Sequence, residues 1–271
     1  MTVTIQAVTA IDECRHIEKL QKEIWTSTDL EVAPDHLLLT IAKEDGVVLL
    51  ARTETGKPVG FAYGFLARTK DGRLKLASHQ AGVLAAYQDD GVGYALKLAQ
   101  RQATLDKRLD LITWTYDPLQ GRNAYFNLHK LGAVCQTYLA NLYGEMRDEL
   151  NQGLPSDRFR VDWWIASAAV AERLAGQSPD YAVADYPILN QGIPLGEGLV
   201  APANTFEPAH SSACLVEIPA DINELKSTAP AVALQWRRQT RAIFEQAFAV
   251  GYTAVDVLRY EDRNYYLLQK D

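Results

Sequence analysis

The sequence predicts an α+β protein in which a mixed central sheet is flanked by helices. Three observations lead to this class: helical and extended patterns follow one another irregularly, three extended runs stand in direct succession, and no regular strand–helix–strand alternation appears. The C-terminal part adds a strand, a long helix and a hairpin, which we expect to form a β-α-β extension.

The first half of the chain supplies the central sheet. Ile17, Leu20 and Ile24 recur at helical spacing, and Pro34 suits the first turn of a second helix. The runs at 47–52, 58–68 and 74–84 are separated by turn residues, which favours a three-stranded antiparallel meander. The full expected order is strand 4–8, helix 11–25, helix 34–42, the meander, helix 92–103, strand 111–116, helix 123–131 and extended chain 134–143.

The composition changes after Gly176. Residues 177–212 contain five of the eleven prolines and no Lys or Arg, which is typical of a long ordered loop or a linker. Beyond it we expect a strand at 214–218, a helix at 230–250 and a hairpin of strands 254–260 and 265–269. We therefore predict a first domain over residues 1–150, and a C-terminal extension or small second domain over 151–271.

Charge and cysteine content exclude several classes of function. The 271 residues carry 27 Lys and Arg against 34 Asp and Glu, a net charge of −7, and no basic run that would attract nucleic acid. No stretch of about 18 apolar residues predicts a membrane span, and the N-terminus lacks the pattern of a signal peptide. Three scattered cysteines and the absence of a metal-ligand motif predict a cytoplasmic protein with reduced thiols and no metal.

The segment most informative about chemistry covers residues 83–95, VLAAYQDDGVGYA. It combines the end of a strand, a short loop and the glycine-containing start of a helix. The first turn of a helix presents unpaired N–H groups and a partial positive charge, and glycines let an anion approach the backbone. Two other phosphate motifs are excluded, because Leu96 occupies the third glycine position of G-x-G-x-x-G and no G-x-x-x-x-G-K-[ST] occurs.

The spacing Gln88-x-x-Gly91-x-Gly93 resembles the Q/R-x-x-G-x-G/A pattern of the GNAT acyltransferase superfamily. The resemblance continues through the strand ITWTY (112–116) and the segment NAYFNLHKLGA (123–133), and covers roughly residues 1–150. The run that begins DPLQGRN is similar to a branch of predicted acyltransferases of uncertain substrate. A helix start with glycines also occurs where a helix merely packs close to a sheet, and this alternative stays open.

The resemblance implies an acyl-CoA donor, such as acetyl-CoA or succinyl-CoA, and a GNAT-like mixed sheet. It implies that the strand end, the loop and the helix start bind the donor, and that a second segment flanks its pantetheine arm. The implied donor-binding residues are Val83, Leu84, Gln88, Asp89, Asp90, Gly91, Val92, Gly93 and Tyr94 in the loop region, with Asn123 and Phe126 in the second segment.

Two positions depart from the family pattern. Asp89 and Asp90 stand where the family usually has glycine and a basic or polar residue, and their carboxylates repel a pyrophosphate unless they point outward. The tyrosine that serves as general acid in many relatives is replaced by Leu128. The candidates for acid–base catalysis are then His79, Asp117 and Tyr138, each of which has a structural alternative as a packed, turn or core residue.

Arginines are the candidate ligands of a substrate carboxylate. Arg158 shares a strand face with Arg160, and Arg237 and Arg241 share a helix face. A guanidinium fork matches the carboxylate of an amino acid or of a dicarboxylic acyl group. The alternative is that these arginines pair with the protein's own surplus of Asp and Glu.

Together these observations predict an enzyme that moves an acyl group from acyl-CoA to a small amine, such as an amino acid, by direct attack on the thioester. The extension either completes the acceptor pocket or pairs two protomers into a homodimer. The alternative function is a catalytically degenerate GNAT-fold module for binding or assembly.

Overall fold

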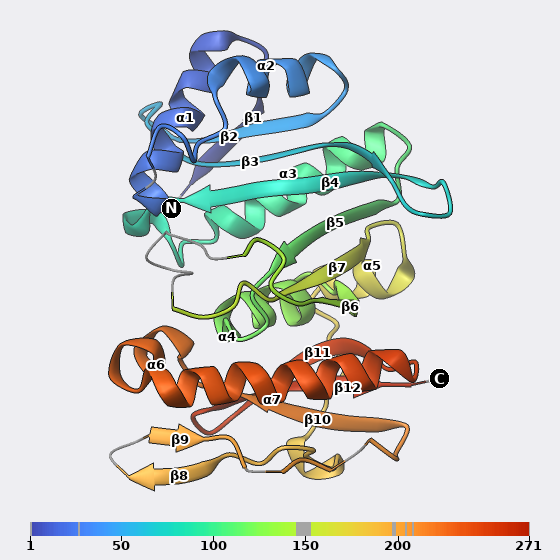
Figure 1. Cartoon of the computed structure of the whole chain (residues 1–271). Helices are drawn as coiled ribbons and strands as arrows, with labels where there is room; N and C mark the ends of the chain where they lie inside the picture. Colours follow the sequence, from blue (N-terminus) through green and yellow to red (C-terminus); the bar gives the residue numbers. More distant parts are fainter. Residues whose placement is uncertain are drawn as a thin grey trace. The chain divides into compact units, whose positions relative to one another are not determined.

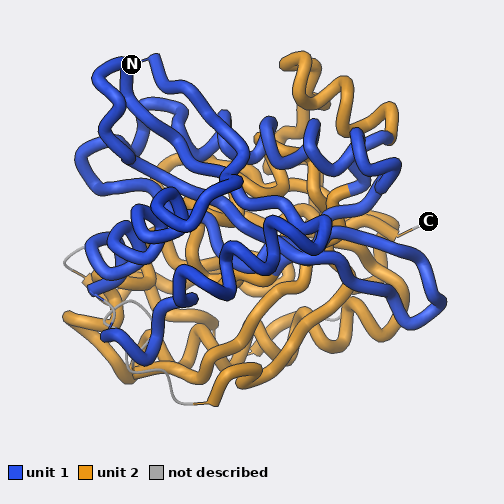
Figure 2. Tube along the Cα trace, turned by 90° about the horizontal axis from the view of Figure 1, so that it is seen from above, with its two compact units in different colours: residues 1–114, 164–166 blue, residues 115–163, 167–271 orange. Residues whose placement is uncertain are grey.

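The computed structural model describes residues 2–26, 28–144, 153–196, 199–203, 205–207 and 209–270. It divides into two compact units (Figure 2): unit 1 comprises Met1–Trp114 and Trp164–Ala166, and unit 2 comprises Thr115–Trp163 and Ser167–Asp271. The domain boundary expected at 150 falls within 145–152, outside the described residues, and stays a prediction.

Unit 1 contains a five-stranded sheet in the order β1-β2-β3-β4-β5 (Figure 1). Strands β1 to β4 pair antiparallel, and β5 runs parallel to β4. The expected meander is therefore confirmed as β2, β3 and β4. The strands span Val3–Ala7 (β1), Val47–Thr53 (β2), Pro58–Arg68 (β3), Leu74–Val83 (β4) and Leu111–Tyr116 (β5, whose last two residues belong to unit 2).

Helices cover both faces of the sheet in unit 1. They are α1 (Ile11–Trp25), α2 (Asp35–Lys43) and α3 (Val92–Asp106), with a 3-10 turn η1 (Ala85–Tyr87) before α3. A Cβ added at Gly60 would meet Leu96 of α3 at 3.3 Å, and one added at Gly82 would meet Trp25 of α1 at 3.2 Å. Because Gly82 pairs with Phe61, next to Gly60, the two glycines face opposite sides of the sheet, and so do α3 and α1.

The apolar stripes of α1 and α2 form a hydrophobic core with one face of the sheet in unit 1. Cys14, Ile17 and Leu20 of α1 and Leu38 of α2 are buried. They form one cluster with residues of β2 and β3, namely Val48, Leu50, Phe61 and Tyr63. Such a stripe on one helix face is what makes an amphipathic helix dock on a sheet.

Unit 2 contains an antiparallel sheet in the order β7-β6-β11-β12-β10 (Figure 1). The strands span Val134–Leu139 (β6), Arg158–Trp164 (β7, whose last residue belongs to unit 1), Ala213–Ile218 (β10), Thr253–Tyr260 (β11) and Arg263–Gln269 (β12). The predicted strand, long helix and hairpin at the C-terminus are thus present as β10, α7 and β11-β12. A separate two-stranded sheet, β8 (Ile193–Gly196) with β9 (Leu199–Ala201), lies in the proline-rich stretch and was not expected from the sequence.

The helices of unit 2 differ from expectation in the segment 123–131, and the helical segments at 168–174, 183–185 and 222–228 were not predicted. The segment predicted as one short helix, 123–131, is a turn α4 (Gly121–Ala124) followed by a π-helical stretch η2 (Tyr125–Lys130). The sequence also did not reveal α6 (Ile222–Thr228), which Asp221 caps by accepting hydrogen bonds from two backbone N–H groups. The remaining helices are α5 (Ala168–Leu174), η3 (Val183–Asp185) and α7 (Pro230–Ala249). Among the helices of the described ranges, none is both long and apolar enough to span a bilayer.

Aromatic side chains form the core of unit 2. Phe159 of β7 is fully buried, and its ring centroid lies 4.7 Å from that of Phe244 and 5.2 Å from that of Tyr266. Trp163 and Trp236 are also fully buried, and their indole N–H groups donate to the carbonyls of Leu131 and Val200 at 2.7 and 2.9 Å. These tryptophans can stay inside because each polar edge is satisfied.

The close approach of β3 to β4 depends on Gly64. A Cβ at Gly64 would lie 2.7 Å from the carbonyl oxygen of Ala77 and 3.0 Å from the Cα of Ser78, both backbone atoms. We expect Gly64→Ala to destabilise the protein by roughly 2 kcal/mol, because backbone cannot move aside as a side chain can. Gly93→Ala is the matched control, since its nearest neighbour, a side-chain methyl of Val83, is 3.9 Å away. Equal urea midpoints for the two variants would contradict this account.

Candidate functional site

Strands β4 and β5 part within unit 1. In the described residues their paired positions are Leu76 with Ile112 and Ala77 with Thr113. On its other side β4 stays paired with β3 as far as Val83, with a bulge at His79, between the pairs Tyr63–Gln80 and Gly64–Ser78. A bulge bends the strand that contains it. From Ser78 onward, β4 therefore has an edge with no paired strand in the described part of unit 1.

This edge leads directly into the loop singled out by the sequence. Leu84 N–H still donates to the carbonyl of Val59 at 2.9 Å, and η1 follows. Asp89 and Gly91 have φ values of 67° and 81°, in the left-handed region that glycine adopts without strain. Gly91 is the N-cap residue of α3, and its carbonyl accepts the first helical hydrogen bond, from Ala95 N–H at 2.9 Å.

The first turn of α3 has the properties of an anion site. Because the helical ladder begins at Ala95, the N–H groups of Val92, Gly93 and Tyr94 precede it. The first turn contains no acidic residue, and no side chain caps it. The helix dipole adds partial positive charge at the same place. This end of α3 can therefore hold a phosphate group against backbone donors.

The polar side chains of the loop differ in what they do. Gln88 folds back, and its amide donates to the carbonyl of Val83 at 3.1 Å, which ties the loop to the end of β4. Asp89 and Asp90 are both exposed, so solvent screens their charge. The repulsion expected from these two carboxylates is thus reduced by their exposure.

Lys97 is the residue of this region that the sequence analysis missed. It lies on α3 and is only 5 % exposed. Its Nζ lies 3.0 Å from both Ser78 Oγ and Gln100 Oε1, and 4.0 Å from the ring centroid of Trp114. Burial lowers the pKa of Lys97 to about 7. A signal was available: Gly93, Lys97, Gln100 and Thr104 form a polar stripe at helical spacing beside the apolar one.

His79, the first catalytic candidate, faces away from Lys97. Its ring packs on Tyr63 and Phe65 with centroid separations of 5.5 and 6.0 Å. Tyr63 belongs to the cluster under α1 and α2, whereas Lys97 lies on α3, at the opposite face of the sheet. Partial burial lowers the pKa of His79 below its ordinary value.

Unit 2 brings two of the other candidates together. Asp117, a predicted acid–base residue, forms an ion pair with Arg237, a predicted carboxylate ligand. Arg237 is fully buried, and its Nε and Nη1 have no hydrogen-bond partner among the described residues. Although burial opposes its charge, the adjacent Asp117 carboxylate raises the pKa of Arg237 above its ordinary value.

A buried aspartate that was not predicted from the sequence accepts hydrogen bonds from three further candidates. Asp157 is fully buried and receives a bidentate contact from Arg241, at 2.8 Å from Nε and 2.6 Å from Nη2. Tyr138 donates its hydroxyl to the same carboxylate at 2.6 Å, and burial raises the pKa of Tyr138. Arg158 is buried too, and its Nη1 donates to the backbone carbonyl of Asp157 at 2.9 Å. Arg241 is therefore already paired with a carboxylate of the protein.

The second segment that was predicted to bind the donor lies in unit 2. Asn123 is exposed on α4, and Phe126 is half-buried on η2. Leu128, at the position of the family's tyrosine acid, is fully buried. The structure thus assigns the loop residues to unit 1, and Asn123 and Phe126 to unit 2.

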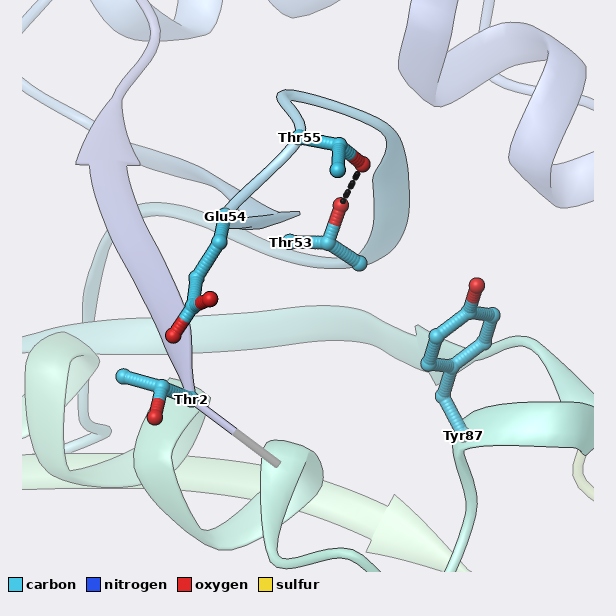
Figure 3. A pocket seen from close by; sticks show the side chains of 5 residues that line it. All are labelled: Thr2, Thr53, Glu54, Thr55 and Tyr87. Carbon is cyan, nitrogen blue, oxygen red and sulfur yellow. Dashed lines mark hydrogen bonds between the residues drawn. The ribbon is translucent and has the colours of Figure 1, made fainter.

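A pocket lies beside the loop in unit 1 (Figure 3). It has a volume of about 360 Å³ and is lined by Thr2, Thr53, Glu54, Thr55 and Tyr87. The hydroxyls of Thr53 and Thr55 are hydrogen-bonded at 2.9 Å, and Lys57 lies over the ring of Tyr87. Of these residues only Tyr87 belongs to the segment 83–95. Within the described residues no group of three or more His, Cys, Asp or Glu side chains could hold a metal ion.

Comparison with known proteins finds similarity at the level of structure. No protein-family model matches the sequence, and the search of curated proteins finds no relative. Among solved structures, Naa50 of Arabidopsis thaliana, in complex with a bisubstrate analogue, gives a TM-score of 0.47 at 18 % identity, with 60 % of this chain and 98 % of that one covered. The ribosomal-protein-S18-alanine N-acetyltransferase of Escherichia coli gives 0.47 at 15 %, with 62 % and 96 % covered. A GNAT-family acetyltransferase of Streptococcus pneumoniae gives 0.47 at 14 %, with 59 % and 98 % covered.

The buried amine of Lys97 predicts a pH-dependent stability. Unfolded Lys97 has a pKa of about 10.4, and the folded value is lower, so between these two values the unfolded chain binds more protons and stability rises with pH. We expect Lys97→Met to abolish this contribution, which amounts to roughly 1 kcal/mol per pH unit. Lys97→Met should therefore exceed the parent in stability most at pH 7, and the difference should narrow toward pH 9. Urea unfolding at both pH values tests this, and a constant difference would contradict it.

Proposed function

We propose that this protein is an acyl-CoA-dependent N-acyltransferase that transfers the acyl group directly to an amine. The observation that carries the proposal is the continuity in unit 1 between the unpaired edge of β4 and the uncapped start of α3. An acyl-CoA is an extended amide-containing arm attached to a pyrophosphate. The edge of β4 suits the extended arm, and the start of α3, which follows it in the chain, suits the pyrophosphate.

The pyrophosphate binds at the N–H groups of Val92, Gly93 and Tyr94. The pantetheine arm lies along β4 from Ser78 to Val83, where its amides pair with the strand edge as an added strand would. This edge of six residues is about 20 Å long. The thioester then reaches the place where β4 and β5 part, which lies at the opposite end of the edge from the loop.

The environment of Arg237 in unit 2 supports the proposal that one of the substrates carries a carboxylate. Arg237 combines complete burial with two guanidinium nitrogens that have no partner in the described residues. A buried donor without a partner is unfavourable, so a carboxylate bound there would be stabilised. We therefore propose an acceptor such as an amino acid or a peptide, or a donor such as succinyl-CoA, with Arg158 and Arg241 shaping the surroundings.

A binding module without catalysis is the alternative, and Leu128 favours it because no hydroxyl is available at that position. Thermal melting with CoA, acetyl-CoA and succinyl-CoA tests the binding that both functions share. Release of free CoA thiol from each acyl-CoA, measured over a panel of amines, amino acids and short peptides, separates the two. Binding without thiol release supports the module, and no binding contradicts both.

The pyrophosphate site predicts opposite effects of one substitution on binding and stability. We expect Tyr94→Glu to weaken acetyl-CoA binding about tenfold, because the new carboxylate faces the phosphates at close range. The same carboxylate should leave stability unchanged or raise it, because acidic residues favour helix N-termini. Tyr94→Gln is the matched control without the charge. Calorimetric titration gives the affinities, and equal affinities for the two variants would contradict the site.

The carboxylate site predicts a substrate-dependent loss. We expect Arg237→Lys to lower kcat/KM for the carboxylate-bearing substrate at least tenfold, because Lys cannot form the planar fork. For the corresponding methyl ester or amide, kcat/KM should change by less than about threefold, which is within the ordinary variation between variants. Arg173→Lys is the control, since Arg173 also pairs with a buried carboxylate of unit 2, that of Asp256. Equal losses for acid and ester would contradict the assignment.

A further inference from the structure

A buried amine lies at the point where β4 and β5 stop pairing. We propose that Lys97 is the general base of the reaction: its neutral Nζ takes a proton from the acceptor ammonium, so that the amine can attack the thioester. This inference rests on the acyl transfer proposed above, to which it adds a catalytic residue that is not among those predicted from the sequence.

The position of Nζ is fixed by three elements of unit 1. Ala77 and Thr113 are the last paired residues of β4 and β5, and Ser78 and Trp114 are the residues that follow them. Nζ lies 3.0 Å from Ser78 Oγ and 4.0 Å from the Trp114 ring centroid. Lys97 therefore holds its amine at the point where the two strands separate, which is where the thioester end of a donor lying along β4 would arrive.

The surroundings of Nζ allow both charge states. Its contacts are a hydroxyl from β4, an amide from α3 and an indole from β5, none of which titrates near neutral pH. Within the described residues Lys97 has no ion pair with a carboxylate, so burial is the cause of its lowered pKa, about 7. The face of Trp114 favours the ammonium and opposes this shift. A base is most effective when its pKa lies near the working pH.

The hydrogen bonds also leave the amine able to accept a proton. An ammonium has three N–H donors, and two positions are directed to Ser78 Oγ and Gln100 Oε1. In the neutral form the remaining position of Nζ is a lone pair. The two hydrogen bonds hold the nitrogen in place while this third position gains or loses a proton.

The proposed reaction conserves protons. The acceptor ammonium gives one proton to Nζ, and the resulting amine attacks the thioester carbonyl carbon. A C–N bond forms, the C–S bond breaks, and the second proton lost by the nitrogen goes to the leaving CoA thiolate. Lys97 then returns its proton to solvent. The products are an amide, CoA thiol and one proton for each ammonium consumed.

Other basic groups of unit 1 are less suited to this task. His79 packs on Tyr63 and Phe65, on the face of the sheet opposite Lys97. Tyr63 donates its hydroxyl to Gln80 at 3.1 Å, and burial raises its pKa, so it stays protonated. Among these groups, Lys97 combines the position at the gap with a pKa suited to a base.

The test is the pH profile of kcat/KM for Lys97→Met, measured by thiol release from acetyl-CoA with the best amine of the acceptor panel. We expect a loss of about 100-fold at pH 7. The loss should shrink by about tenfold for each pH unit toward the pKa of the acceptor, because the fraction of neutral amine in solution rises by that factor. The affinity for acetyl-CoA should stay within about threefold of the parent.

Lys107→Met is the matched control, because Lys107 directly follows α3 and pairs with Asp45 at the surface. It should keep the parental profile. A loss in Lys97→Met that is equal at every pH would show a structural role and overturn the proposal, as would an unchanged profile. If the parent protein releases no thiol with any amine of the panel, the proposed function itself fails, and so does the role of Lys97. If the parent is active and only the profile of Lys97→Met disagrees, the failure is confined to Lys97.

Discussion

The end of the hydrogen-bond ladder between β4 and β5 is the constraint on which the candidate site of unit 1 depends. The ladder contains the pairs Leu76–Ile112 and Ala77–Thr113, and the bulge at His79 bends β4 directly after them. A strand edge with unpaired N–H and C=O groups is a template for an extended ligand. On its other edge, β4 remains paired with β3 up to Val83, which holds the strand in place.

The loop after β4 joins this edge to the first turn of α3. Gln88 ties the loop to Val83, and Gly91 turns the chain through a left-handed conformation into α3. The first N–H groups of α3 are then free of helical acceptors at a fixed distance from the strand end. The protein has a net charge of −7, and two of its carboxylates, Asp89 and Asp90, lie on this loop. The proposed phosphate binding therefore depends on backbone dipoles rather than on the overall charge.

The cations Arg237 and Arg241 of unit 2 have different neighbours from Lys97 of unit 1. In unit 2, Arg241 is compensated by Asp157 and Arg237 by Asp117, so each guanidinium stays charged. In unit 1, Lys97 has neutral polar and aromatic neighbours instead, and its pKa falls to about 7. Arginine keeps its charge under almost any conditions, whereas a buried lysine changes its charge readily. The paired arginines thus keep their charge, whereas the charge of Lys97 depends on pH near neutrality.

Local sequence determined much of the fold. Helix 11–25 and the strands at 58–68 and 111–116 were predicted with the bounds that the structure has, because strong periodicity and turn residues define their ends. The order of strand end, loop and helix start at residues 83–95 was also predictable, since these parts are contiguous in the chain. The short strands β8 and β9 and the capped helix α6 lack such periodicity and were missed.

What only the tertiary structure decided is which polar side chains are buried and with which partners. Asp157 meets Arg241 across 84 residues, and Lys97 meets Ser78 and Trp114 from a helix that looks amphipathic in sequence. Burial sets the charge state of such groups, and burial depends on packing between elements far apart in the chain. The sequence by itself therefore determined where the start of a helix follows a strand end and a glycine-containing loop, and the fold decided that the Lys97 amine is buried among neutral neighbours.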